Sequence, residues 1–239
     1  MAVLQGAEYY ISKRVGKAMV DYGMLSDGDK IAVAVSGGKD SLTLLRVLND
    51  RKSFVPIKYD LLAVHIDLGY PRSCAAVLEK YFKKAGLRYH IEKVDVLKKI
   101  RRKDINCFWC SWNRRKALFE AANRFGCNKV ALGHHKDDVI ETILLNLFFQ
   151  GEISAMAPKQ ELFRGKIILI RPLVYVEEYM IRRFAKEEGL LNKACSCPNS
   201  ITSQRTKMAD IIRNLKRTCP DVKTNIFRSI KRIKKDYLL

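Results

Sequence analysis

The sequence predicts an α/β fold: a parallel sheet with helices on both faces. Short apolar segments rich in Val, Ile and Leu alternate with longer amphipathic segments along most of the chain. Parallel neighbours in a sheet need crossover connections, and strands covered on both faces are continuous apolar runs. Hydrophobic residues make up 48% of the 239 residues, which is enough for a sizeable core.

The first predicted strand is the apolar run IAVAV at 31–35. The later strands are predicted at 61–67, 88–95, 129–135 and 167–173. Helices are predicted at 7–22, 40–49, 74–86, 111–126, 137–149, 177–189, 204–216 and 221–234. We therefore expect an N-terminal helical segment (1–27), a catalytic α/β domain (28–200) and a basic helical C-terminal extension (201–239).

The charge of the chain points to a polyanionic partner. Lys and Arg number 45 against 25 acidic residues, a net charge of +20, and basic residues concentrate at 98–116 and at 201–239. Such clusters are typical of nucleic-acid surfaces, although a single run is more often a solvated helix face. No apolar run approaches the roughly 18 residues of a membrane span, and no signal sequence begins the chain. We expect a cytoplasmic protein without a membrane partner.

The segment SGGKDS at 36–41 directly follows the first strand and has the features of a phosphate site. Glycines let the backbone approach an anion, a lysine adds positive charge, an aspartate holds Mg²⁺ on phosphates, and serines donate hydroxyl hydrogen bonds. These residues are Gly37, Gly38, Lys39, Asp40, Ser36 and Ser41, with Val35 at the end of the strand before them. The segment is too short for the GxxxxGK(S/T) P-loop.

Two further polar segments follow strands of the predicted sheet. His65 and Asp67 end the second strand, and GHHKDD at 133–138 follows the fourth. Carboxyl ends of parallel strands meet at one edge, so these segments should share a crevice with SGGKDS. Gly133 puts a small residue near the ligand, and Asp138 is a second Mg²⁺ candidate. His134 and His135 are better explained as structural or supporting residues than as catalytic ones.

Seven cysteines without a secretion signal indicate thiols or metal ligands rather than disulfides. Cys107 and Cys110 form CxxC, and Cys195 and Cys197 form CxC further on. A CxxC serves as a redox pair, as half of a zinc site or in an iron–sulfur site. The other three, Cys74, Cys127 and Cys219, have no such spacing, and we expect them to be structural.

SGGKDS after a strand resembles the signature SGGxDS of the PP-loop ATP pyrophosphatase superfamily. The resemblance implies that the loop grips the pyrophosphate of ATP and that AMP is transferred to a substrate oxygen. It also implies that His65 and Asp67 lie where relatives hold adenine and ribose.

SGGKDS, GHHKDD and CxxC, with a cysteine about 90 residues further on, resemble the tRNA thiolation group of this superfamily, closest to its 2-thiocytidine synthetases. In that group three cysteines bind a 4Fe–4S cluster, and carried over by position they are Cys107, Cys110 and Cys197. The resemblance implies ATP, Mg²⁺ and the cluster as cofactors and tRNA as partner. Sulfide or a persulfide carrier would be the sulfur donor. The implied catalytic residues are Lys39, Asp40 and Arg114, the last steadying phosphates or the leaving AMP.

The target base and two rival functions stay open. The termini lack the zinc-finger cysteine pairs of thiouridine synthetases, but Ala194 stands where the thiocytidine branch has a cysteine. One rival is a tRNA ligase of lysidine synthetase type without a cluster. The other is an RNA-binding module with zinc on Cys107, Cys110, Cys195 and Cys197. Docking of tRNA on the C-terminal helices across a homodimer is a further hypothesis.

Overall fold

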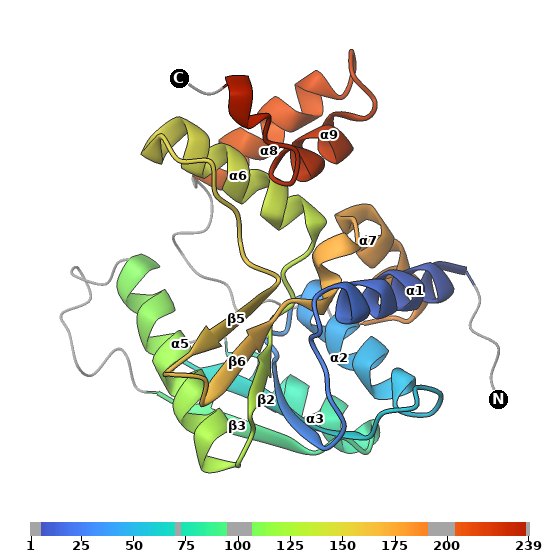
Figure 1. Cartoon of the computed structure of the whole chain (residues 1–239). Coiled ribbons are helices and arrows are strands. Elements are labelled where there is room, and N and C mark those ends of the chain that lie inside the picture. Colours follow the sequence, from blue (N-terminus) through green and yellow to red (C-terminus); the bar gives the residue numbers. More distant parts are fainter. Residues whose placement is uncertain (1–5, 70–72, 95–106, 191–203, 238–239) are drawn as a thin grey trace.

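A computed structural model gives the fold of residues 6–69, 73–94, 107–190 and 204–237. A six-stranded sheet with the order β3-β2-β1-β4-β6-β5 lies at its centre (Figure 1). All neighbouring strands are parallel except β5, which pairs antiparallel with β6. The strands are β1 (Asp29–Ala34), β2 (Tyr59–Asp67), β3 (Tyr89–Lys93), β4 (Lys129–Ala131), β5 (Lys159–Leu162) and β6 (Ile167–Ile170).

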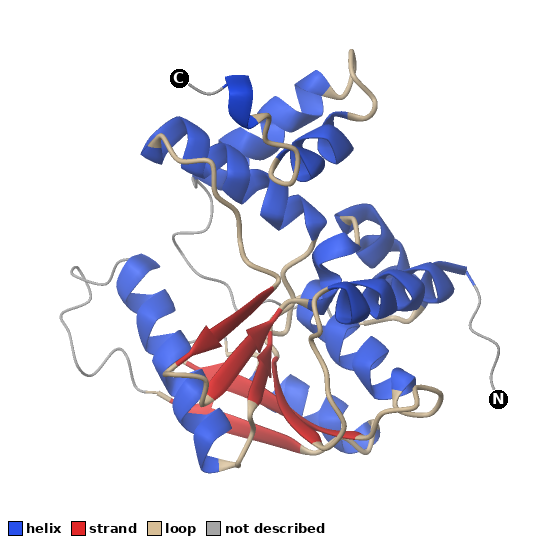
Figure 2. Ribbon diagram, viewed as in Figure 1, coloured by secondary structure: helices blue, strands red, loops and turns tan. Residues whose placement is uncertain are grey.

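Helices cover both faces of the sheet, as Figure 2 shows. The α-helices are α1 (Gly6–Asp21), α2 (Lys39–Arg51), α3 (Ala75–Lys84), α5 (Cys107–Arg124), α6 (Lys136–Gln150), α7 (Glu178–Glu187), α8 (Gln204–Leu215) and α9 (Val222–Ser229). Two short 3-10 helices, η2 (Pro172–Tyr175) and η3 (Lys235–Tyr237), complete the described elements. None of the helices in the described part of the chain is long and apolar enough to cross a membrane.

The two faces of β1 belong to different cores, which explains its unbroken apolar sequence. Ile31 and Val33 pack into the core that includes α1, α2 and α7, whereas Ala32 packs into the core under α5. Successive side chains of a strand point to opposite faces, so a strand buried on both sides needs apolar residues at every position. The parallel, doubly covered sheet predicted from the sequence is confirmed.

Several elements differ from the predicted ones. The strand predicted at 167–173 ends at Ile170, and the helix predicted at 221–234 ends at Ser229. β4 is confined to Lys129–Ala131 because the chain leaves the sheet before Gly133, which lies against the start of α2. β5 was not predicted, since its sequence KQEL is polar and lies on the sheet edge with only partial burial. It joins β6 through a turn in which Phe163, Arg164 and Gly165 all have positive φ.

The C-terminal helices pack on α6 rather than on the sheet. Ile140 and Leu144 of α6 form a separate core with Met208 and Ile212 of α8 and with Val222 next to them. The basic faces of α8 and α9 are thereby held beside the helix that begins with the GHHKDD segment (Figure 1).

Candidate nucleotide and catalytic site

The SGGKDS segment forms a loop between the carboxyl end of β1 and the start of α2. Gly37 has φ 84°, a left-handed conformation that only glycine adopts without strain. Gly38 is the N-cap of α2 and makes no side-chain cap hydrogen bond, so the first N–H groups of the helix point out of the loop. An uncapped helix N-terminus with a positive dipole end is a site for an anion such as phosphate.

The serine hydroxyls of this loop hold its shape. Ser41 Oγ donates to the carbonyl oxygen of Gly38 at 2.9 Å and accepts from Ser36 N at 3.1 Å. The two hydroxyl oxygens lie 3.3 Å apart. Ser41 is therefore a structural element of the loop, and the backbone N–H groups are the donors best placed for phosphate.

Gly133 brings the GHHKDD segment against the first turn of α2. A Cβ atom at Gly133 would lie 3.0 Å from Ser41 N and 3.1 Å from the carbonyl carbon of Asp40, both backbone atoms. The predicted meeting of these two segments is thus found, and glycine is required there by space rather than by backbone conformation. β1 and β4 are paired directly, which carries both segments to one edge of the sheet.

His135 lies between the two carboxylates that we expected to hold Mg²⁺. Its Nε2 is 3.7 Å from Asp40 Oδ1, and its Nδ1 is 3.4 Å from Asp138 Oδ2. Asp138 and His135 form a capping box at the start of α6, since Asp138 Oδ2 also accepts from His135 N at 2.8 Å. His135 is buried and supports both carboxylates, as its interpretation as a supporting residue predicts.

Asp40 fits the role of a magnesium ligand. Its Oδ1 is buried and accepts no hydrogen bond within the described residues, whereas Lys39 Nζ lies 3.0 Å from this oxygen and donates to the other one, Oδ2, at 3.1 Å. A buried carboxylate oxygen without a hydrogen bond is costly unless a cation binds it. Among the described residues no group of three or more His, Cys, Asp or Glu side chains could hold a metal ion by itself. Mg²⁺ in phosphate sites is typically bound by one or two carboxylates, with phosphate and water as its other ligands.

Lys39 has an acidic partner that the sequence did not identify. Its Nζ is 3.0 Å from Oε1 of Glu178, in the first turn of α7. Burial opposes both charges, but the pairing with Asp40 and Glu178 raises the pKa of Lys39. Hydrogen bonds from Lys39 and Arg182 outweigh burial and lower the pKa of Glu178 to about 2. Lys39 is therefore a fixed positive charge at the loop.

A second acidic group lies one turn along α6. Burial, and then the charge of Asp138, raise the pKa of Glu141 to about 7. Arg205 of α8 lies 3.5 Å from Asp138 and 3.7 Å from Glu141, and partly offsets this repulsion.

His65 and Cys74 form the floor beneath the loop. His65 Nδ1 donates to the carbonyl oxygen of Val35 at 2.7 Å, because a carbonyl oxygen only accepts. Its Nε2 lies 3.9 Å from Cys74 Sγ. Cys74 Sγ also lies 3.7 Å from the carbonyl oxygen of Ser36. His65 thus positions the nucleotide loop through the backbone. Asp67 ends β2 and bonds Gly69 N at 3.0 Å.

His134 is held by Arg171, another residue that sequence reasoning did not single out. Arg171 Nε donates to His134 Nδ1 at 3.3 Å, and the guanidinium also bonds the carbonyl oxygen of Ala157. Burial lowers the pKa of His134 to about 4, so the ring is neutral at pH 7. A neutral, hydrogen-bonded histidine is structural here, as predicted.

The predicted cluster ligands are only partly within the described residues. Cys107 and Cys110 are one turn apart at the start of α5, and Cys110 is buried. The side chain of Cys107 and the whole of Cys195 and Cys197 lie outside the description. Arg114 is exposed on α5, and within the described residues no recorded contact joins it to the SGGKDS loop.

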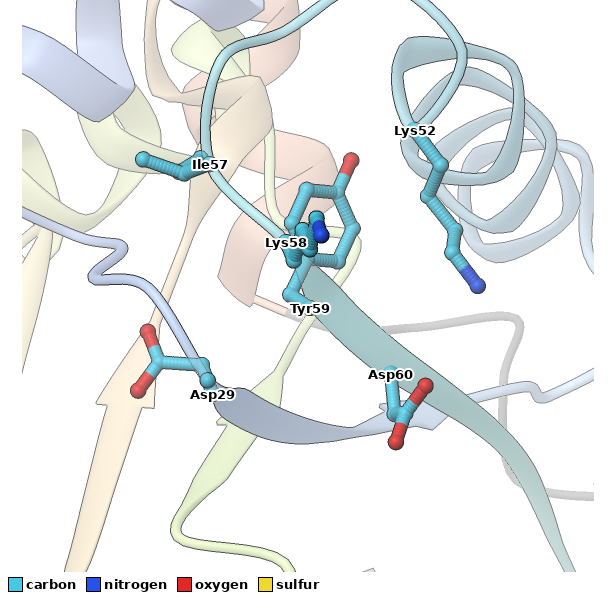
Figure 3. A pocket seen from close by; sticks show the side chains of 7 residues that line it. Asp29, Lys52, Ile57, Lys58, Tyr59 and Asp60 are labelled. Atoms are coloured by element: carbon cyan, nitrogen blue, oxygen red, sulfur yellow. The ribbon is translucent and has the colours of Figure 1, made fainter.

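A hollow of about 280 Å³ lies at the opposite edge of the sheet (Figure 3). Its lining residues are Gly28, Asp29, Lys52, Ile57, Lys58, Tyr59 and Asp60, at the amino ends of β1 and β2. Asp29 is already paired with the buried Lys129 at 2.6 Å. The hollow is remote from the three converging segments and does not belong to the catalytic crevice.

Comparison with known proteins agrees with this geometry. A family model described as a PP-loop domain matches residues 8–193. The chain is 43% identical to a tRNA-cytidine(32) 2-sulfurtransferase of Geobacter sulfurreducens, over 96% of this chain and 91% of the relative. It is 41% identical to the protein of the same name from Geotalea uraniireducens, over 96% and 93% of the two chains.

A solved structure is also similar over nearly the whole chain. It is the U34-tRNA thiolase NcsA from Methanococcus maripaludis with its 4Fe–4S cluster, at 26% identity and a TM-score of 0.77. The similarity covers 95% of this chain and 79% of the thiolase.

Proposed function

Because the chain belongs to the PP-loop domain family, and within it to the family of the tRNA-cytidine(32) 2-sulfurtransferases, we propose that it replaces the 2-oxygen of cytidine 32 in tRNA by sulfur. It is an ATP-dependent tRNA thiolase that uses Mg²⁺ and a 4Fe–4S cluster. The observation that carries the proposal is the contact of Gly133 with the first turn of α2, which assembles SGGKDS and GHHKDD into one crevice.

ATP activates the base for substitution. The 2-carbonyl oxygen of cytosine attacks the α-phosphorus of ATP, and the bond to pyrophosphate breaks. The N–H groups at the start of α2 and the ammonium of Lys39 face the leaving pyrophosphate, where negative charge accumulates. We propose that Asp40 and Asp138 hold Mg²⁺ on the phosphates, with His135 between them.

Sulfur then replaces the adenylated oxygen. Hydrosulfide adds to C2, AMP leaves with the former carbonyl oxygen, and loss of the sulfur-bound proton gives the 2-thio base. When bound, the cluster would supply a soft metal site for sulfide-level sulfur. Cys107, Cys110 and Cys197 would be its ligands, and Arg114 on the exposed side of α5 would meet the departing AMP or an RNA phosphate.

The surroundings of the reaction are also part of the proposal. Sulfide donates the sulfur directly, whereas a persulfide carrier would need a thiol, itself oxidised to a disulfide, to release its outer sulfur as hydrosulfide. The reaction takes place in the cytoplasm, where tRNA is modified. We further propose that the C-terminal extension, 201–239, docks tRNA, since exposed basic residues of α8 and the following turn face away from α6.

The docking surface can be tested by charge, because truncation would uncover the apolar residues of α6. Replacing Arg213, Lys216 and Arg217 together with Gln is expected to weaken tRNA binding about 10-fold or more and to reduce the salt slope of log K by about 2 to 3. ATP affinity stays at the wild-type value. Lys80, Lys83 and Lys84 of α3, replaced in the same way, are the matched control. Filter binding measures the tRNA affinity. An equal loss of tRNA affinity in both triple variants would argue against a C-terminal docking surface.

The function is tested by nucleoside analysis. Anaerobically purified protein is incubated with Mg²⁺, ATP, sodium sulfide and a tRNA transcript that carries C32, and the digested RNA is analysed by mass spectrometry. We expect 2-thiocytidine with ATP, none without it, and none from a transcript that carries U32. A 2-thiouridine product would show that the enzyme modifies a uridine and not cytidine 32.

The same assay with an amino acid added, and metal analysis of the purified protein, separate the rival functions. A lysidine synthetase-type ligase would join an amino acid to tRNA, and would do so with Cys107 replaced. A zinc-binding RNA module would contain zinc and give no modified nucleoside. Either outcome would replace the proposed reaction.

A further inference from the structure

The carboxylate of Asp137 links three helices at the catalytic crevice. Asp137 is buried, and Glu178 N donates to its Oδ2 at 2.7 Å. Lys223 of the C-terminal extension donates to the other oxygen, Oδ1. Both oxygens of this side chain thus have partners from elements other than its own, whereas its neighbour Asp138 caps α6 itself.

The bond to Glu178 gives α7 the cap that its own sequence lacks. Glu177 occupies the N-cap position of α7 and makes no side-chain cap hydrogen bond. An aspartate from another helix that accepts a first-turn N–H takes over this role. The backbone position of Glu178 is therefore set by Asp137.

Glu178 in turn sets the position of the lysine of the SGGKDS loop. Its Oε1 is 3.0 Å from Lys39 Nζ and 2.9 Å from an Arg182 nitrogen. Lys39 has one other acidic partner among the described residues, Asp40. A shift of the α7 terminus would therefore move the ammonium that faces the phosphates, or leave Glu178 to repel them.

Lys223 ties this arrangement to the basic extension. It follows Val222, which packs on Ile140 of α6, and it precedes Thr224, whose Oγ1 accepts from Lys136 Nζ at 3.4 Å. Without Lys223, the buried carboxylate of Asp137 would lose its bond to a lysine while it stays next to the carboxylates of Asp138 and Glu178. Removal of one partner from a buried ion pair leaves a costly uncompensated charge.

We propose that Asp137 is a positioning residue for ATP, which fixes Lys39 through Glu178 and makes this position depend on the docking of α9 through Lys223. The inference rests on the proposed function only in taking the phosphates of ATP as the anion that Lys39 meets. It gives the C-terminal extension a second role besides contact with RNA: completion of the nucleotide site.

The test measures the Kd for ATP with Mg²⁺ by calorimetry, on full-length protein purified anaerobically. We expect Asp137→Asn and Lys223→Met each to weaken ATP binding by about 3- to 10-fold, and the double variant to be no weaker than the worse single one, because both act on one path. In steady-state thiolation the KM for ATP should rise and kcat should fall, because Lys39 also faces the charge that accumulates on the leaving pyrophosphate. Lys223→Arg keeps the ion pair and should keep the affinity.

Lys207→Met is the matched control, since Lys207 is an exposed lysine of the same extension with no recorded contact to Asp137 within the described residues. It should bind ATP as wild type does. If Lys223→Met lowers the melting temperature but leaves the ATP Kd at the control value, the contact is merely structural and the inference is overturned. If wild-type protein binds no ATP, the proposed function itself fails.

Discussion

A Cys110→Ser variant is expected to be purified colourless, with iron and sulfide at background levels and thiolation reduced by at least about 100-fold. Cys110 is buried in the first turn of α5, one helical turn after Cys107. A cluster held by three thiolates has no ligand to spare, and a serine hydroxyl is a poor substitute for a soft thiolate. Iron and sulfide analysis and the visible absorption spectrum measure the loss.

Cys127→Ser is the control that matches Cys110 in burial. Cys127 is buried under the same helix, and burial raises the pKa of its thiol, as expected for a protonated packing residue. This variant should lose some stability but keep its iron, its colour and its activity. Loss of the chromophore in both variants would indicate a packing effect. Full iron content in Cys110→Ser would remove this thiol from the ligand set.

The order of the elements was predictable because the buried strands are unbroken apolar runs. In β1 and β2, consecutive apolar residues indicate that both faces of the strand are buried. β5 carries no such signal: it is a polar edge strand that exists only because a turn at Phe163 to Gly165 returns the chain against β6. Pairing with a neighbour, rather than any preference of KQEL, makes it a strand.

The parts of the site whose residues are adjacent in the sequence could be predicted. SGGKDS and GHHKDD follow their strands directly. Because ligands bind at the carboxyl ends of parallel strands, the sequence alone predicts that the two segments share one crevice. The partner of Lys39 was not predictable, because Glu178 comes from a helix far along the chain and its sequence resembles any amphipathic helix start. Likewise, only the bonds of Asp137 to Glu178 of α7 and Lys223 of α9 distinguish it from Asp138, which caps its own helix.

Gly133→Ala is expected to lower the affinity for ATP strongly, because Gly133 lies where the GHHKDD and SGGKDS segments meet. The backbone of Gly133 has an ordinary φ, so alanine brings no backbone strain, only a methyl group in occupied space. Its Cβ would stand 3.0 Å from Ser41 N, tighter than nine in ten Cβ contacts in proteins, and the neighbour is backbone that cannot rotate away. The GHHKDD segment or the start of α2 must therefore move.

A shift of either segment separates Asp40 and His135, whose atoms are 3.7 Å apart, and displaces the N–H groups that face the phosphates. Overpacking of this kind costs about 1 to 3 kcal/mol. If this cost falls on the nucleotide-binding geometry, ATP affinity drops by about 10- to 100-fold. Calorimetric titration with ATP and Mg²⁺ measures the drop.

Gly28→Ala separates this loss from general destabilisation. Gly28 has φ 80° and open space around it, at the edge of the sheet opposite to the crevice. Alanine there should lower the free energy of unfolding by about 1 to 2 kcal/mol through left-handed strain and leave ATP affinity unchanged. If Gly133→Ala instead loses stability like Gly28→Ala while it binds ATP normally, the contact between the two motifs would be a packing contact, and the nucleotide site would have to be sought away from it.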